Sequence, residues 1–300
     1  MWSTRWILSL ILALIAILAG FYYGSDLIDA LYTVDPYWVI WGIACYAVNY
    51  SLRAIRFRIL SNKAIKFWPE GLHAACFHGF ATYMMPFRSG EMTLPIVLRS
   101  TSGLNLTEGS RILVQARLLD LQILGMWIVL AALLADIQFS KTMMSVWLAM
   151  GIAMMTAPTL IRRLASSGRR SGYRLFAWFG RFADAKPTSS AAKLTSAGIW
   201  MMVAGCYFCA ARSIGLPLDL IQVWVLISIQ LPMQLIPVQG IANAGNHEGG
   251  WVAGLLLLGV PAKKAMEFAL LSHVIILAYV LALAPAALIT GYCCPEKKTH

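Results

Sequence analysis

The stretch Pro86-Phe87-Arg88-Ser89-Gly90-Glu91 interrupts a segment, residues 70–102, that is otherwise apolar enough to enter a membrane. Proline cannot continue a helix because it lacks a backbone N–H and its ring clashes with the preceding turn. Irregular backbone at membrane depth is tolerated only where protein or a water-filled cavity satisfies its polar groups. We therefore predict a re-entrant or broken helical hairpin over residues 70–102.

A second segment, residues 218–259, has the same organisation. It contains Pro232 and Pro237, then a stretch rich in glycine and polar residues from Gly240 to Glu248, and it ends in a further apolar run. Proline and glycine clusters of this kind mark turns between helical segments. We predict a second re-entrant or broken hairpin over residues 218–259.

The residues around the two breaks have matching spacing. In each copy a glutamate precedes a glycine, by 12 positions in the first and 11 in the second, and an ionisable residue follows that glycine by 14 positions. The three residues are Glu91, Gly103 and Arg117 in the first copy, and Glu248, Gly259 and His273 in the second. This match predicts an internal repeat.

The whole chain has the composition of a membrane protein. Of its 300 residues 59% are hydrophobic and 12% are charged, about half the charged fraction of a typical soluble domain. A membrane-spanning helix needs about 20 mostly apolar residues. Six windows meet this need and are predicted spans: 6–23, 37–55, 112–135, 142–160, 192–212 and 266–290.

The basic residues predict the orientation of these spans. With the amino terminus in the cytoplasm, 18 of the 24 Lys and Arg fall on the cytoplasmic side, four fall outside, and Arg88 and Arg117 lie at or within the membrane. Positive residues accumulate in cytoplasmic loops, so we predict that both termini are cytoplasmic. The net charge of +11 is then explained by topology and anionic lipid headgroups, without nucleic acid.

The order span, span, hairpin, span occurs twice, over residues 1–136 and 137–300. In the predicted orientation the two copies enter the membrane from opposite sides, which is the inverted-repeat pattern of many secondary transporters. The predicted fold is an all-α polytopic membrane protein with six full transmembrane helices and two hairpins. Basic and aromatic residues over 161–191 predict an amphipathic connector on the cytoplasmic surface.

Charged residues within the first repeat are candidates for binding an anion. Arg88 with Glu91, and Arg117 with Asp120, are each three positions apart, a spacing that allows pairing on one helical face. Arginine's planar fork suits phosphate. Within a span a charge costs about 2.5–3.5 kcal/mol on insertion scales, so either these pairs merely neutralise each other and hold the hairpin to its neighbouring helix, or they face a cavity and bind a headgroup.

The second repeat supplies polar and proton-exchangeable side chains at the equivalent place. We expect them to contact a polar headgroup or to couple its movement to protons, with interhelical hydrogen bonding as the alternative. They are Gln239, Asn243, Asn246, His247, Glu248 and His273. No metal-ligand spacing, nucleotide-binding loop or catalytic motif accompanies them, so we predict no metal, no cofactor and no catalytic residue.

The first motif, Pro86 to Glu91 followed by Gly103 and Ala116-Arg117-Leu118-Leu119-Asp120, resembles the membrane region of lysylphosphatidylglycerol synthases and related stand-alone flippase-like proteins. Pro237, Gly240, Glu248 and Gly259 resemble the family's second motif. Here residues 239–247 replace a compact Gly-Gly turn, and His273 stands where an arginine is expected. The resemblance implies movement of lipids between leaflets, including aminoacylated phosphatidylglycerol in some members and polyprenyl-linked or hopanoid lipids in others. We expect no lipid aminoacylation, because no block resembling the transferase domain is present.

Together these features predict a flippase or transporter, rather than an enzyme, in the bacterial cytoplasmic (inner) membrane. It would move an anionic phospholipid or a polyprenyl-phosphate-linked lipid through a polar cavity between the repeats. Two alternatives stay open: an integral membrane enzyme acting on a lipid-linked substrate, with Glu91 and Glu248 as acid and base, and a non-transporting partner of a lipid synthase. A homo-oligomer and a complex with a lipid-synthesis enzyme are both compatible with the sequence.

Overall fold

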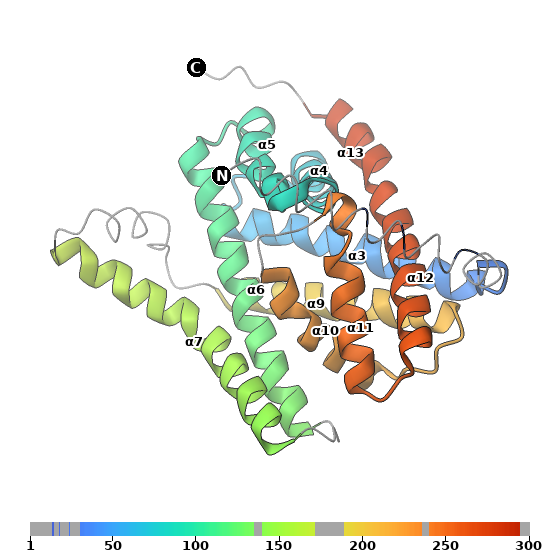
Figure 1. The fold of residues 1–300 in the computed structure, drawn as a ribbon. Helices are drawn as coiled ribbons and strands as arrows, with labels where there is room; N and C mark the ends of the chain where they lie inside the picture. The colour runs from blue at the N-terminus through green and yellow to red at the C-terminus, as the bar shows by residue number, and fades with distance from the viewer. Residues whose placement is uncertain are drawn as a thin grey trace. The chain divides into compact units, whose positions relative to one another are not determined.

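A computed structural model describes residues 31–134, 140–171, 189–235 and 240–294, together with the isolated residues 14, 18 and 24. Every regular element in these ranges is helical (Figure 1). In chain order they are α3 (Pro36–Leu60), η1 (Phe67–Gly71), α4 (Leu72–Met84), η2 (Pro86–Met92), α5 (Thr93–Ser102), α6 (Leu106–Leu134), α7 (Lys141–Ser171), α9 (Ser190–Ser213), α10 (Leu220–Leu235), η3 (Ile241–Asn243), α11 (Asn246–Leu257), α12 (Ala262–Leu281) and α13 (Leu283–Tyr292). The predicted all-α class is confirmed for these ranges.

Four helical segments of the described ranges are long and apolar enough to cross a membrane: Leu106–Leu134, Lys141–Arg163, Ser190–Ser213 and Ala262–Tyr292. They confirm four of the six predicted spans, and the protein is a multi-pass membrane protein. The predicted span 37–55 lies in the 25-residue helix α3, which is not among these four segments. The predicted span 6–23 lies outside the described residues, apart from Leu14 and Leu18. The count of six therefore stays a prediction.

The amphipathic connector predicted over residues 161–191 begins inside a helix. Helix α7 continues through Pro158 to Ser171, so residues 161–171 belong to the same helix as the candidate span Lys141–Arg163, and their place on the membrane surface stays a prediction. The remainder of the predicted connector, from residue 172 to residue 188, lies outside the described ranges.

Both predicted breaks are present. In the first hairpin the chain leaves α4, and Phe87 and Arg88 have φ of 56° and 55° before α5 begins. In the second hairpin Ala242 and Asn243 have φ of 54° and 63° before α11 begins. Two successive non-glycine residues in the left-handed region are unusual. The surrounding structure therefore stabilises this backbone conformation at each break.

The two hairpins also end in the same way. Helix α5 is followed by Gly103 with φ of 72° and α11 by Gly259 with φ of 78°, the left-handed conformation that commonly ends helices. In both cases the next helix starts three residues after the glycine, α6 at Leu106 and α12 at Ala262. The two hairpins therefore share this local backbone feature, while the internal repeat and the inversion of one copy relative to the other stay predictions.

By packing, the chain divides into two compact units. One, here called the second-break unit, contains residues 1–48, 79–91 and 202–285, and the other, the Asp120 unit, contains residues 49–78, 92–201 and 286–300. This division follows contacts instead of sequence repetition, so it leaves the predicted repeat boundary at residues 136 and 137 untested.

Small residues allow close helix packing within each unit. In the Asp120 unit α6 and α7 lie side by side (Figure 1), and a Cβ at Gly125 would collide with the backbone of Gly151 and Met155. In the second-break unit a Cβ at Gly254 would come within 2.8 Å of Leu226 on α10. Close contact at small residues is typical of helix packing in membranes.

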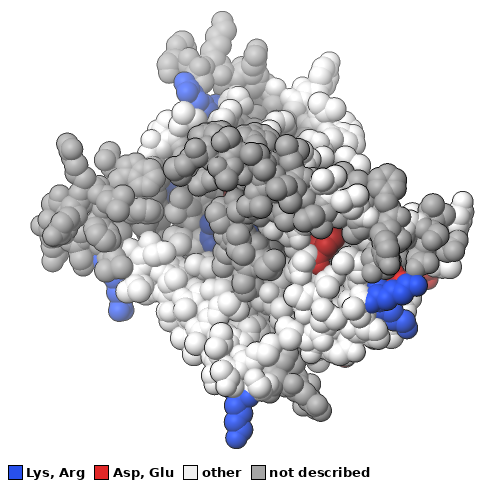
Figure 2. All heavy atoms as spheres, in the orientation of Figure 1, with Lys and Arg blue, Asp and Glu red and all other residues white. Residues whose placement is uncertain are grey.

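The described surface suits a lipid environment. Large apolar side chains are strongly exposed on several helices, among them Ile40 at 65%, Leu133 at 69% and Leu194 at 76%. On the face drawn in Figure 2 most described atoms belong to uncharged residues, and Lys and Arg atoms are confined to a few places. Apolar side chains exposed in this number mark a surface that contacts lipid or protein instead of water.

Candidate functional site

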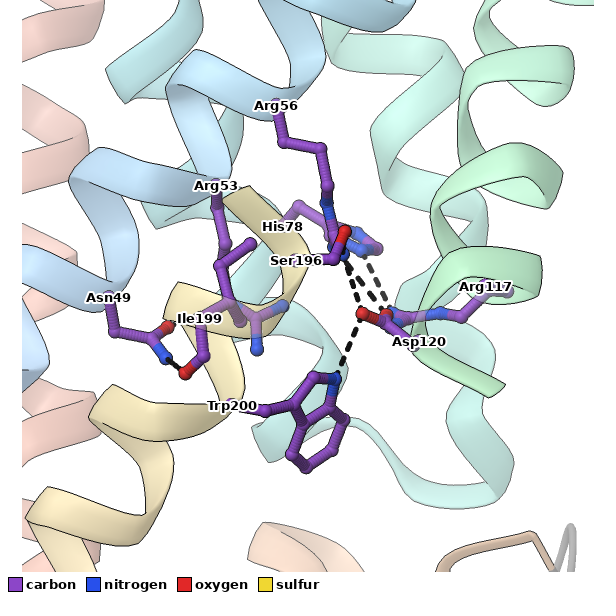
Figure 3. Close-up of polar contacts among 9 residues, drawn as sticks. All are labelled: Asn49, Arg53, Arg56, His78, Arg117, Asp120, Ser196, Ile199 and Trp200. Atoms are coloured by element: carbon purple, nitrogen blue, oxygen red, sulfur yellow. Dashed lines mark hydrogen bonds and ion pairs between the residues drawn. The ribbon is translucent and has the colours of Figure 1, made fainter. Parts of the chain in front are cut away.

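A buried ion pair forms the centre of the first polar cluster, which lies within the Asp120 unit (Figure 3). Arg56 on α3 places Nη1 2.5 Å from Oδ1 of Asp120 on α6, and the side chains are 1% and 8% exposed. Arg56 Nη1 also donates to Ser196 Oγ on α9 at 3.2 Å. The pair therefore links three helices at a depth where an unpaired charge would be costly.

Asp120 accepts from two further donors. Arg117, one turn earlier on α6, donates from Nη1 to Asp120 Oδ2 at 3.0 Å, and Trp200 on α9 donates from Nε1 to Oδ1 at 3.2 Å. Unlike Arg56, the Arg117 side chain is 36% exposed. The carboxylate is thus saturated by protein donors, whereas one of its arginines still reaches a surface.

His78 extends the cluster to the start of α5. Arg117 Nη2 lies 3.4 Å from His78 Nε2, and because arginine can only donate, Nε2 is the acceptor. The other ring nitrogen, Nδ1, then carries the hydrogen and faces Thr93 Oγ1 at 3.3 Å. Neutral His78 therefore connects Arg117 to the first residue of the helix that follows the break.

The cluster has more positive than negative charge. Arg53, one turn before Arg56, donates through Nε to Asn49 Oδ1 at 2.8 Å, lies over the Tyr50 ring, and interacts electrostatically with Asp120. Asn49 in turn donates to the Ile199 carbonyl at 2.9 Å, which positions it for Arg53. Among the described contacts, two guanidinium groups thus pair with the Asp120 carboxylate and a third, that of Arg53, interacts with it electrostatically, an arrangement that favours an anionic ligand.

The second polar cluster lies within the second-break unit and is built on Glu248 and His273. Glu248, in the first turn of α11, pairs through Oε1 with His273 Nδ1 on α12 and accepts the Gly245 N–H through Oε2 at 2.7 Å. His273 Nε2 lies 2.8 Å from the carbonyl oxygen of Ala242. Both side chains are mostly buried, at 10% and 12% exposure.

His247 packs beside this pair. Its ring stacks on that of His273 with centroids 4.6 Å apart, and its Nε2 lies 3.0 Å from Ser272 Oγ. Because the Ser272 hydroxyl donates to the Ala269 carbonyl, His247 Nε2 is the donor in that contact. His247 Nδ1 is buried and, among the described residues, has no hydrogen-bond partner.

Most predicted site residues fall in these clusters or at the breaks. The predicted pairing of Arg117 with Asp120 is confirmed, while their role in binding stays a prediction. Arg88 and Glu91 are partly buried within η2, and Asn243 is partly buried within η3. Asn246 is buried in the first turn of α11, and Gln239 lies outside the described residues.

Sequence reasoning missed most of the residues around Asp120 and Arg117, among them Arg56, Trp200 and His78. Arg56 is one of the 18 Lys and Arg that the predicted topology puts on the cytoplasmic side, yet it is 1% exposed and its Nη1 lies 2.5 Å from Asp120 Oδ1. Trp200 and His78 carried no local signal, since an indole or imidazole within an apolar helix is usually ordinary packing. The spacing of Arg53 and Arg56 in α3 is the one signal that could have indicated paired arginines.

The two clusters differ in the chemistry that they can support. The Asp120 cluster offers excess guanidinium groups for an anion, and the Glu248 cluster offers two imidazoles and a carboxylate for a proton. Within the described ranges, no three His, Cys, Asp or Glu side chains converge to hold a metal ion.

Comparison with known proteins gives one family. No curated protein and no solved structure matches the chain. The family described as the lysylphosphatidylglycerol synthase TM region matches residues 6–284, which contain both breaks and both polar clusters. The chain belongs to the lysylphosphatidylglycerol synthase transmembrane-region family.

Proposed function

We propose that this protein moves a lipid with an anionic, phosphate-bearing headgroup between the leaflets of the bacterial inner membrane, with both termini in the cytoplasm. The observation that carries the proposal is the charge balance around Asp120, where Arg53, Arg56 and Arg117 face one carboxylate. A low-dielectric site with excess cations is stabilised by a further anion. A lipid phosphate would supply such an anion.

Arg117 is the residue best suited to meet that phosphate. Its side chain keeps 36% exposure, whereas Arg56 is buried and its terminal nitrogens pair with Asp120 and Ser196. Asp120 would then hold the Arg117 guanidinium in place, supported by its own ion pair with Arg56, and His78 would accept a further hydrogen bond from Arg117. A bidentate guanidinium contact to phosphate is among the stronger hydrogen-bonded pairs in proteins.

The hydrogen bonds made by Glu248 favour a transport role over a catalytic one. An acid–base role for Glu248 needs a carboxyl oxygen free to face substrate, but Oε1 faces His273 and Oε2 accepts the Gly245 N–H. We therefore favour a transporter over an enzyme acting on a lipid-linked substrate.

The proposal is tested in proteoliposomes that contain a fluorescent phosphatidylglycerol, a fluorescent polyprenyl phosphate or a fluorescent phosphatidylcholine. We expect faster movement of one phosphate-bearing anionic lipid than of the zwitterionic lipid. Arg117→Gln should slow that movement at least about tenfold, the effect of losing one charge-assisted contact. Mass analysis of the recovered lipid should show an unchanged molecule, whereas a changed mass would indicate an enzyme.

The matched control is Arg99→Gln. Arg99 lies in the last turn of α5, is exposed, and belongs to the same unit, so its loss removes an equal charge without touching the cluster. If both variants move lipid at the wild-type rate while remaining folded, the Asp120 cluster does not bind the substrate. If all three lipids move equally, the proposed selectivity for anions is wrong.

A further inference from the structure

We propose that the Glu248–His273 pair is a proton-binding site, and that the bound proton holds the second break against helix α12. This inference goes beyond lipid movement, since it assigns an ion to the protein and does not depend on the identity of the lipid. It rests on hydrogen-bond geometry within the second-break unit.

The ring of His273 faces groups that fix its hydrogens. Nε2 points at the Ala242 carbonyl oxygen at 2.8 Å, and a carbonyl can only accept, so Nε2 carries a hydrogen. Nδ1 points at Glu248 Oε1. A neutral imidazole with its hydrogen on Nε2 has a lone pair at Nδ1, which would repel an ionised carboxylate, so one further proton must lie between Nδ1 and Oε1.

The same pair holds both sides of the break. His273 binds the carbonyl of Ala242, whose φ of 54° places it in the left-handed region, and Glu248 binds the N–H of Gly245 at 2.7 Å. Helix α12 is thereby connected to η3 by one hydrogen bond and to the start of α11 by the shared proton. The pair acts as a latch between the break and α12.

Release of the proton to water undoes one part of this latch. If the proton leaves, the carboxylate of Glu248 faces the lone pair of His273 in a mostly buried setting, which is unfavourable. His273 can relieve this repulsion by turning away or by moving its remaining hydrogen to Nδ1, and either change gives up the Ala242 carbonyl. Deprotonation therefore loosens the break.

Neighbouring titratable groups keep the pair at one proton. His247 on α11 acts electrostatically on both Glu248 and His273, and a second positive ring stacked at 4.6 Å would be repelled. Tyr83 on α4 meets His273 edge-on with centroids 6.1 Å apart, and Tyr207 on α9 lies beside His247. His273 and Glu248 keep exposures of 12% and 10%, so neither side chain is completely enclosed by the described residues.

The Glu248→Gln variant removes the titratable proton and keeps the hydrogen-bond geometry of the site. A glutamine can accept the Gly245 N–H through its oxygen and donate to His273 Nδ1 through its nitrogen, so it reproduces the protonated pair without an exchangeable proton. The matched control is Glu267→Gln on α12, the helix that carries His273, where Glu267 is 29% exposed and pairs with Lys263 at 3.8 Å.

The test is hydrogen–deuterium exchange of the purified wild-type protein in nanodiscs, without added lipid substrate, at pH values on both sides of neutrality. After correction for the intrinsic pH dependence of amide exchange, we expect residues 246–257 to exchange at least about tenfold faster at the alkaline end, as for loss of a buried hydrogen bond. Glu248→Gln should be protected at every pH, and Glu267→Gln should behave as the wild type.

Two outcomes overturn the proposal. Exchange in residues 246–257 of the wild type that does not vary with pH would show that no titrating group controls the break, and this arm needs no variant to fold. Exchange in Glu248→Gln that still varies with pH would assign the titration to another group. Because lipid movement is not measured, failure here leaves the proposed lipid site unaffected, and failure of the lipid assay leaves the latch unaffected.

Discussion

Arg56 on α3 and Asp120 on α6 are paired at 2.5 Å, and both side chains are almost completely withdrawn from solvent. The chain therefore maintains a full charge pair in the interior of its helices, together with Arg117 and the indole of Trp200. Such a pair is costly to desolvate and is destabilising when one partner is removed. It constrains how the protein tolerates substitution.

Asp120→Asn should destabilise the protein severely. The change leaves the guanidinium of Arg56 buried without a counter-charge, at a cost of about 3–5 kcal/mol. Denaturation with SDS in mixed micelles measures the loss, and adding Arg56→Met to the variant should restore part of it. Glu108→Gln, an exposed acid on the same helix, is the control and should stay near wild type. A wild-type denaturation curve for Asp120→Asn would contradict the ion pair.

Trp200→Phe should have a smaller effect. Phenylalanine keeps most of the apolar volume but removes the Nε1–H bond to Asp120, a loss of about 1–2 kcal/mol. Because Arg56 and Arg117 still neutralise the carboxylate, lipid movement should be retained. The same denaturation assay applies, with Trp68→Phe as control, since Trp68 is 52% exposed. A loss as large as that of Asp120→Asn would show that the indole has a further role.

Arg117→Lys should weaken binding of an anionic lipid while preserving the fold. Arg117 uses two amino groups, one toward Asp120 and one toward His78, and a lysine ammonium cannot reproduce that planar fork. We expect about tenfold weaker retention of phosphate-bearing lipid in native mass spectrometry. Arg99→Lys serves as the control. Equal retention in Arg117→Lys and the wild type would indicate that only charge matters.

Gly125→Ala should separate α6 from α7. The added methyl group would meet the backbone of Gly151 and Met155, which cannot move aside as a side-chain end can. Overpacking of this kind costs about 1–3 kcal/mol. Thermal unfolding in detergent tests it, and Met126→Leu, at a neighbouring position that is 36% exposed, is the control. An unchanged midpoint for Gly125→Ala would contradict the close approach of the two helices.

Local sequence signals predicted a substantial part of this structure. Proline, glycine and apolar periodicity act over a few residues, so the breaks at Pro86 and near Gly240 and four of the spans could be recognised directly. The i,i+3 spacing of Arg117 and Asp120 predicted their pairing because both lie on one helix. The residue span of the family match agrees with the resemblance of the two motifs.

The partners that come from other helices could not be predicted in this way. Arg56 is 64 positions from Asp120, and Trp200 is 80. An arginine near a span end has the same sequence appearance whether it reaches the headgroups or turns inward. The Glu248–His273 contact joins residues 25 positions apart. The spacing that these two residues share with Glu91 and Arg117 predicted equivalent places in a repeat, but it did not predict that Glu248 and His273 touch.

Composition and short-range pattern thus determined that the chain is helical, membrane-embedded and broken at two places, because helix propensity, proline geometry and lipid solvation depend on neighbouring residues. The tertiary structure alone decided which charges are paired. An ion pair or a shared proton depends on a few ångströms between helices, and that distance is set by side-chain packing across the fold. For this protein the chemistry of Asp120 and of Glu248 is therefore a property of helix packing.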